Sequence, residues 1–126
     1  MANTILVVED NALNLKYFND LLQAEGYNTL QAGDSEAAFA AARSRRPDLI
    51  LMDLRLPGLS GFDAASRFKA DGDLAAIPIV AVSALSGKAD EAQARDAGCI
   101  SYLRKPVSAS DLLEMVRSVL ESRPVH

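Results

Sequence analysis

Asp53 is the residue whose type and surroundings most clearly indicate chemistry. It follows a run of four apolar residues, 49–52, and precedes the segment 54–58, which contains a proline and a glycine. An apolar run of this length is typical of a buried parallel strand, and open α/β sheets bind their ligands at the carboxyl ends of such strands. Asp53 is therefore a candidate reactive carboxylate.

A second apolar run, residues 5–8, ends in the same way at Glu9 and Asp10. Two such strands would bring three carboxylates to one place, where like charges repel unless a cation joins them. Mg²⁺ binds through a few carboxylates and keeps several waters and phosphate oxygens. Glu9, Asp10 and Asp53 therefore predict a divalent metal site, with Mg²⁺ as the favoured ion and Asp53 as a nucleophile toward phosphorus.

Two further predicted strands end in residues of complementary chemistry. Ser83 follows residues 79–82, and Lys105 lies just beyond residues 100–103 and directly before Pro106. Lys105 could hold a phosphoryl oxygen as a compact cation, and Ser83 could donate a hydrogen bond to another. The Lys105–Pro106 bond can be cis at modest cost, and the sequence leaves its isomer open. Each residue alone has an ordinary explanation, but together at strand ends they favour a phosphoryl-transfer site.

The composition limits the classes of protein to consider. The chain has 126 residues, 49% hydrophobic and 24% charged, which suits one globular domain. A net charge of −4 argues against a nucleic-acid partner, because phosphate binding needs clustered Lys and Arg. The one cysteine, Cys99, excludes an internal disulfide and a cysteine metal cluster. The sequence lacks the patterns of a membrane span and of a signal peptide, so we expect a cytoplasmic chain with no membrane partner.

Five apolar runs alternate with five helical patterns, which predicts a parallel α/β sheet with right-handed crossovers. The strands are expected at residues 4–8, 28–32, 49–52, 79–82 and 100–103. The helices are expected at about 12–25, at about 36–45 with Ser35 as N-cap, after 59–61, at about 88–97 and after Ser110-Asp111. Alanine supplies all the apolar side chains of the fourth helix, so this helix buries little apolar area. We therefore expect the fourth helix to be held less firmly than the other helices.

The chain resembles the receiver domains of bacterial two-component response regulators over essentially its whole length. The segments that carry the resemblance are Val8-Glu9-Asp10-Asn11, Leu51-Met52-Asp53-Leu54, Leu56-Pro57-Gly58-Leu59-Ser60-Gly61, Val82-Ser83-Ala84 and Tyr102-Leu103-Arg104-Lys105-Pro106. The segment Glu9-Asp10-Asn11-Ala12-Leu13-Asn14, with no output domain after the receiver, is most similar to single-domain regulators of the DivK type. The resemblance implies a single receiver domain over residues 1–126. Its expected fold is a flavodoxin-like, doubly wound, five-stranded parallel sheet of order 2-1-3-4-5 with five helices.

The resemblance also implies roles for particular residues. Asp53 would be the phosphoacceptor, Glu9 and Asp10 would be acidic metal residues, and Arg55 would bind the metal through its backbone carbonyl. Lys105 would contact the phosphoryl group. The donor would be a histidine kinase or a histidine phosphotransfer protein.

Ser83 and Tyr102 match the switch positions of receiver domains. In that family, the hydroxyl residue moves toward the phosphoryl group, the aromatic side chain turns inward, and the surface of the fourth helix, fifth strand and fifth helix changes. This surface would engage a downstream protein partner. The weak anchoring expected of the fourth helix gives a physical reason for it to adopt two positions.

Three other functions remain open from the residues alone. A receiver-like binding module would work without phosphorylation, although all the site positions are filled. A Mg²⁺-dependent phosphatase would use Asp53 as nucleophile, but Arg55 stands where such enzymes usually carry a second acid. A flavin-binding module would need a phosphate-cradling loop after the first strand, where Glu9 and Asp10 would repel phosphate.

Overall fold

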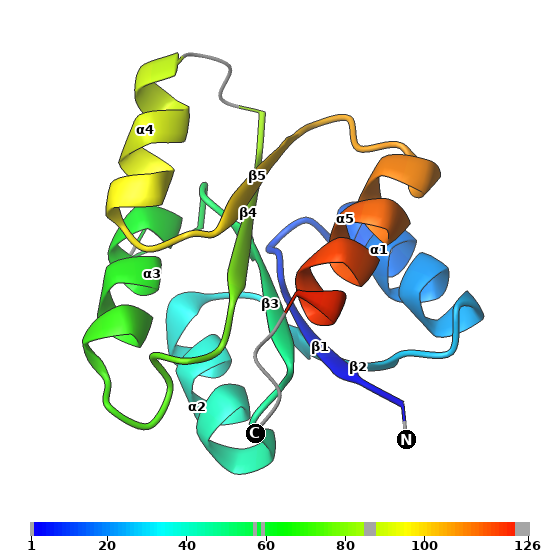
Figure 1. Ribbon diagram of the computed structural model, residues 1–126, viewed down its shortest axis with the longest axis horizontal. Helices are drawn as coiled ribbons and strands as arrows, with labels where there is room; N and C mark the ends of the chain where they lie inside the picture. The colour runs from blue at the N-terminus through cyan, green and yellow to red at the C-terminus, as the bar shows by residue number, and fades with distance from the viewer. Residues whose placement is uncertain (1, 57, 59, 85–87, 123–126) are drawn as a thin grey trace.

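Strands and helices alternate strictly along the chain in the computed structural model, which describes residues 2–56, 58, 60–84 and 88–122 (Figure 1). The strands are β1 (Thr4–Val8), β2 (Asn28–Ala32), β3 (Leu49–Asp53), β4 (Ile79–Ser83) and β5 (Ser101–Arg104). The helices are α1 (Ala12–Ala24), α2 (Ser35–Arg45), α3 (Gly61–Ala70), α4 (Lys88–Asp96) and α5 (Ala109–Glu121). Pro57 and Leu59 of the loop motif, and residues 85–87 and 123–126, lie outside the described residues.

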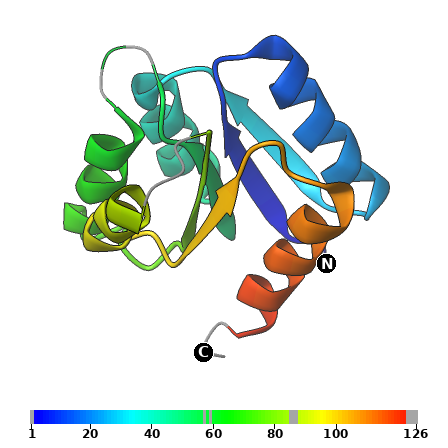
Figure 2. The same cartoon turned by 90° about the horizontal axis from the view of Figure 1, so that it is seen from above.

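The five strands form one parallel sheet in the order β2-β1-β3-β4-β5. Helices α1 and α5 cover one face of the sheet, and α2, α3 and α4 cover the other (Figure 2). This three-layer arrangement is the doubly wound, flavodoxin-like fold, and it confirms the predicted fold class and strand order.

Alternate residues of the central strands supply two separate cores. Ile5 and Val7 of β1 pack with Phe18 of α1 and with α5, whereas Leu6 and Val8 pack with α2 and α3. All four β1 side chains are at most 1% exposed. A strand covered on both faces has to be apolar at every position, which is why β1 and β3 read as continuous apolar runs.

The ends of several elements differ from those expected. Helix α2 begins at Ser35, and its N-cap is Asp34, whose carboxylate accepts a hydrogen bond from the Ala37 amide at 2.8 Å. Ser35 as the N-cap was therefore wrong, because Asp34 holds the extended backbone conformation that a cap requires. Helices α1 and α4 each end one residue before the expected position.

Helix α5 and strand β5 also begin at other residues than predicted. Helix α5 starts at Ala109, because the Ser108 hydroxyl accepts a hydrogen bond from the Asp111 amide at 3.1 Å and so caps the helix. Strand β5 covers Ser101–Arg104, and Ile100, which was expected in the strand, precedes it and is 54% exposed. Strands β3 and β4 each extend one residue further than expected, to Asp53 and Ser83.

Helix α4 is anchored by small side chains, as its sequence predicts. Of its alanines and the one that follows it, Ala94 and Ala97 are buried, and both belong to the core shared with α3. The expectation that α4 can shift stays a prediction.

Among the described helices, none combines the length and the apolar character that crossing a bilayer requires.

Cys99 is expected to react slowly with a chromogenic disulfide reagent in the native protein. The residue is 5% exposed, and burial raises the pKa of its thiol to about 11, against the opposing effect of the nearby Lys69 ammonium. Only the thiolate reacts, so at about pH 8 roughly one thiol in a thousand is reactive, and the rate should rise about tenfold per pH unit. Release of the reagent's chromophore measures the rate. Fast reaction of the native protein near pH 8, matching the rate in urea, would contradict this prediction.

Candidate functional site

Three carboxylates converge at the carboxyl ends of β1 and β3. Glu9 and Asp10 follow β1, and Asp53 is the last residue of β3; each offers an oxygen within 4.8 Å of the others. Strands β1 and β3 are neighbours, with Val8 opposite Met52, so the residues that follow lie at the same height of the sheet. Glu9 is 2% exposed and Asp53 is 5% exposed, whereas Asp10 faces solvent. The predicted convergence of the three acids is therefore present.

Lys105 faces this cluster from the end of β5. Its ammonium nitrogen, Nζ, lies 2.6 Å from Glu9 Oε1 and 3.2 Å from Asp53 Oδ2. The Lys105 amide donates to the carbonyl oxygen of Ser83 at 2.9 Å, which fixes its backbone against the end of β4. The Lys105–Pro106 peptide bond, whose isomer the sequence left open, is cis.

The ionisation of Glu9 and Lys105 reflects this crowding. Burial, followed by contact with the Asp53 carboxyl group, raises the pKa of Glu9, while Lys105 acts in the opposite direction. Burial by itself would lower the pKa of Lys105, but the hydrogen bond to Glu9 and the charge of Asp53 outweigh it, so the pKa is raised. Lys105 is therefore held as an ammonium ion between two acids, and Glu9 is crowded by a second carboxyl group.

Backbone amides fix the orientation of the buried carboxylates. The Arg55 amide donates to Asp53 Oδ1 at 2.9 Å, and the Asn11 amide donates to Glu9 Oε2 at 3.3 Å. The other oxygen of each acid faces Lys105. The Arg55 side chain is exposed, and it forms no ion pair with the described acids. A role for its backbone carbonyl in binding metal stays a prediction.

The predicted switch residues contact each other. Ser83, the last residue of β4, is fully buried, and Tyr102 on the neighbouring strand β5 is half-buried. Burial raises the pKa of the Tyr102 phenol, while a hydrogen bond with the Ser83 side chain acts in the opposite direction. The Ser83 carbonyl accepts a hydrogen bond from the Lys105 amide, so Ser83 contacts both Tyr102 and the backbone of Lys105.

Gly61 is a positioning residue that the sequence shows only as part of a loop motif. Its amide donates to the Leu54 carbonyl at 3.1 Å, and a β-carbon built on it would lie 2.4 Å from the Asp53 carbonyl oxygen. Helix α3 therefore begins directly against the peptide of the candidate phosphoacceptor. The Ser60 hydroxyl caps this helix by accepting the Asp63 amide at 3.2 Å. A lone glycine at the start of a helix carries no sequence signal of such a close approach.

The donor set fits a hard divalent cation. All three acids offer carboxylate oxygens, which are the ligands that Mg²⁺ prefers. Counted by formal charge, three carboxylates and one ammonium carry a net charge of −2, which equals in size the charge of one divalent cation. Asp10, the exposed member, leaves the cluster accessible from solvent.

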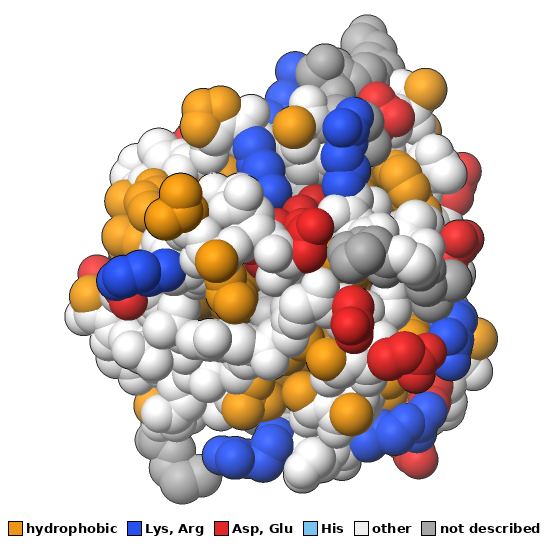
Figure 3. All heavy atoms as spheres, turned by 180° about the vertical axis from the view of Figure 1, so that it is seen from behind, with side chains coloured by type: hydrophobic (Ala, Val, Ile, Leu, Met, Phe, Trp, Pro, Cys, Tyr) orange, Lys and Arg blue, Asp and Glu red, His pale blue; other side chains and the backbone are white. Residues whose placement is uncertain are grey.

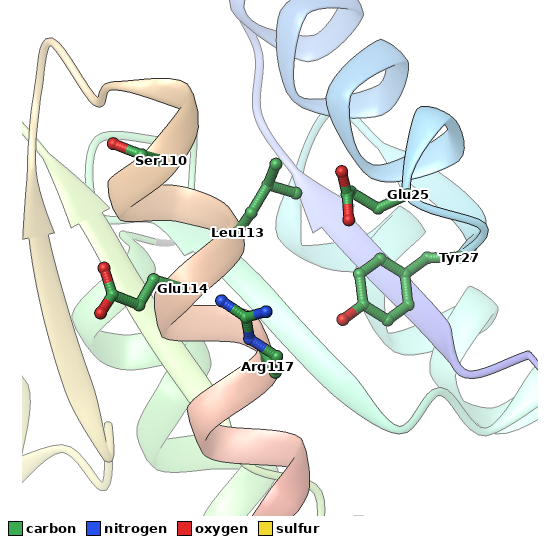
Figure 4. A pocket seen from close by; sticks show the side chains of 6 residues that line it. All are labelled: Glu25, Tyr27, Ser110, Leu113, Glu114 and Arg117. Carbon is green, nitrogen blue, oxygen red and sulfur yellow. The ribbon is translucent and has the colours of Figure 1, made fainter.

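Two surface hollows flank α1 at opposite ends. One, of about 440 Å³, borders the site and is lined by Asn14, Tyr17, Phe18, Ala84, Lys105, Pro106 and Val107. The other, of about 300 Å³, lies between α5 and the turn that joins α1 to β2, and none of its lining residues belongs to the acid cluster (Figure 4). The back of the molecule intersperses basic, acidic and apolar side chains without a continuous basic stripe (Figure 3).

Fold and site together define a signalling receiver built on an open α/β sheet. Residues 5–117 match the sequence profile of the response regulator receiver domain, and the chain belongs to that family. It is a response regulator receiver and not a catalytic enzyme, which excludes the phosphatase and flavin-binding alternatives.

Single-domain regulators are among its curated relatives. The chain is 42% identical over 120 residues to the polar-differentiation response regulator DivK of Brucella anthropi, covering 95% of this chain and 98% of that protein. The DivK protein of Brucella abortus matches at the same identity and coverage. The chain is thus similar to DivK over nearly the full length of both proteins.

Solved receiver structures have the same fold. A putative response regulator from Chloroflexus aurantiacus superposes with a TM-score of 0.92 at 25% identity, covering 96% of this chain and 99% of that one. The receiver domain of a sensor histidine kinase from Pseudomonas aeruginosa superposes with a TM-score of 0.89 at 32% identity, covering 97% and 100%. That receiver domain has a magnesium ion coordinated in its active site cleft.

Proposed function

We propose that this chain is a phosphorylation-controlled response regulator that accepts a phosphoryl group on Asp53. The donor is the phosphohistidine of a histidine kinase or of a histidine phosphotransfer protein. One observation carries the proposal: Asp53 ends a buried strand with its Oδ2 3.2 Å from the Lys105 ammonium and two other acids beside it. A buried carboxylate held in this way is oriented for attack at its strand edge.

In the transfer step, an Asp53 carboxylate oxygen forms a bond to phosphorus as the bond between phosphorus and the donor imidazole nitrogen breaks. The electron pair of that bond returns to the imidazole nitrogen, which takes up a proton from solvent. Lys105 holds a phosphoryl oxygen with its ammonium, and Ser83 donates a hydrogen bond to another. The Arg55 amide keeps Asp53 in place by donating to its Oδ1. Positioning and charge stabilisation are the main requirements of phosphoryl transfer.

Mg²⁺ is the proposed cofactor. Glu9, Asp10 and Asp53 would hold it with their carboxylate oxygens, together with the backbone carbonyl of Arg55. When bound, it neutralises charge on the incoming phosphoryl group. The magnesium ion in the Pseudomonas aeruginosa receiver supports this choice, as does the formal charge of −2 that the three acids and Lys105 carry together.

The output of the proposed regulator is a changed protein-binding surface on α4, β5 and α5. Ser83 moves toward the phosphoryl group, and Tyr102, its contact on β5, follows inward. Helix α4 responds because the side chains that it buries in the core are small, as the burial of Ala94 and Ala97 indicates. The downstream partner is a protein that binds this surface, and the proposed place of action is the cytoplasm. Residues 1–126 act as one receiver domain.

Phosphotransfer from a ³²P-labelled histidine kinase tests the proposal. The chain is expected to take up label when Mg²⁺ is present and to lose this ability in excess chelator. The bound label should behave as an acyl phosphate, lost in alkali and released by hydroxylamine, and it should map to the peptide that contains Asp53. Label on another residue, or equal labelling with and without Mg²⁺, would reject the assignment, and a chain that takes up no label would favour a receiver that works without phosphorylation.

A further inference from the structure

Tyr17 joins helix α1 to the segment that carries Lys105. Its hydroxyl donates a hydrogen bond to the carbonyl oxygen of Val107 at 2.8 Å, across a separation of 90 residues in the sequence. Val107 lies two positions after Lys105, whose ammonium reaches Glu9 and Asp53. The hydrogen bond therefore connects α1 to the backbone that follows Lys105.

Residues 105–107 have an anchor at each end. At the first residue, the Lys105 amide donates a hydrogen bond to the Ser83 carbonyl at 2.9 Å. At the last residue, the Val107 carbonyl accepts a hydrogen bond from the Tyr17 hydroxyl. The side chain of Lys105 is long and flexible, so the place of its ammonium depends on where its backbone is held. Loss of the hydrogen bond from Tyr17 leaves the backbone of residues 105–107 fixed only by the contact with β4.

A hollow lies beside this hydrogen bond, and none of the described side chains fills it. Tyr17, Lys105 and Val107 all line the hollow of about 440 Å³ that opens next to α1. Tyr17 is 40% exposed, and its ring lies next to that of Phe18, with 5.6 Å between the ring centres. The hydrogen bond, rather than close packing, therefore spans the opening between α1 and the Lys105 segment.

We propose that Tyr17 is a positioning residue for phosphoryl transfer, whose hydroxyl holds the backbone that places the Lys105 ammonium opposite Asp53. This inference rests on the proposed function, since Lys105 acts there on the phosphoryl group. Tyr17 itself touches neither the acids nor the phosphoryl group.

The test uses Tyr17→Phe, which removes one oxygen atom and keeps the ring. With acetyl phosphate as donor, the rate constant of Asp53 labelling at saturation is expected to fall about fivefold, the factor that a single hydrogen bond commonly contributes. The half-saturating donor concentration should stay unchanged. The matched control is Tyr27→Phe, at a tyrosine that lines the other hollow, beside α5 (Figure 4). The Tyr27 hydroxyl forms no hydrogen bond to the described residues, so this variant should label at the parent rate.

A double-mutant cycle separates positioning from a general structural role. In a Lys105→Met background, Tyr17→Phe is expected to cause no further loss, because the side chain that it positions is gone. An undiminished rate in Tyr17→Phe, or the same fivefold loss in both backgrounds, would overturn the inference while leaving Asp53 as acceptor. A parent chain that takes up no label on Asp53 would overturn the proposed function and this inference together.

Discussion

The Asp53→Asn variant is expected to take up no measurable phosphoryl group from a donor that labels the parent chain. The substitution replaces a carboxylate with a neutral amide of nearly the same shape, so the hydrogen bond from the Arg55 amide can persist. A neutral amide oxygen is a poor nucleophile toward phosphorus, and loss of a nucleophile commonly costs about a thousandfold or more. Labelling with ³²P in the presence of Mg²⁺ measures the difference.

Asp20→Asn is the matched control for this experiment. Asp20 lies on the exposed side of α1, where its carboxylate contacts the Lys16 ammonium at 2.6 Å, and such surface pairs contribute little to stability. This variant should label like the parent. Equal labelling of Asp53→Asn and the parent would remove Asp53 as the acceptor, whereas loss in both variants would show that the assay responds to charge alone.

The central strands could be predicted because their burial leaves a direct mark on the sequence. Each residue of β1 and β3 contributes to one core or the other, so apolar side chains occupy nearly every position. The carboxylates at their ends then stand out by contrast. The convergence of Glu9, Asp10 and Asp53 follows from the neighbouring positions of the two parallel strands.

The ends of the outer elements could not be predicted in the same way. Asp34 and Ser35 are both good capping residues, and only the backbone conformation decides that Asp34 caps α2. Strand β5 lies at the edge of the sheet, so its apolar pattern is weaker, and the exposed Ile100 looks like a strand residue in the sequence.

Contacts between distant segments leave no local pattern at all. The hydrogen bond from Tyr17 to Val107 depends on how α1 and the segment after β5 meet across 90 residues. In the sequence, Tyr17 is simply one more apolar residue beside the buried face of α1. The approach of Gly61 to the Asp53 peptide likewise leaves no local sequence pattern, because the start of α3 and the end of β3 are fixed by separate parts of the chain.

The Gly61→Ala variant is expected to lower the free energy of unfolding by about 3 kcal/mol, at the upper end of the usual cost of overpacking. A β-carbon at this position would lie 2.4 Å from the Asp53 carbonyl oxygen and 2.5 Å from the Leu54 α-carbon. Both are backbone atoms, so relief requires α3 to move away from the end of β3. That movement displaces the peptide of Asp53, and phosphoryl acceptance should fall together with stability.

Gly72→Ala isolates the close contact from the general effect of replacing glycine. Apart from Gly72 itself and its two chain neighbours, no atom lies within 4 Å of a β-carbon built there, and the backbone avoids the left-handed region. Alanine there restricts mainly the unfolded chain, so stability should be unchanged or rise by up to about 1 kcal/mol. Urea unfolding of both variants measures the difference. If Gly61→Ala unfolded at the same urea concentration as Gly72→Ala, the start of α3 would have room to adjust, and Gly61 would not fix the position of Asp53.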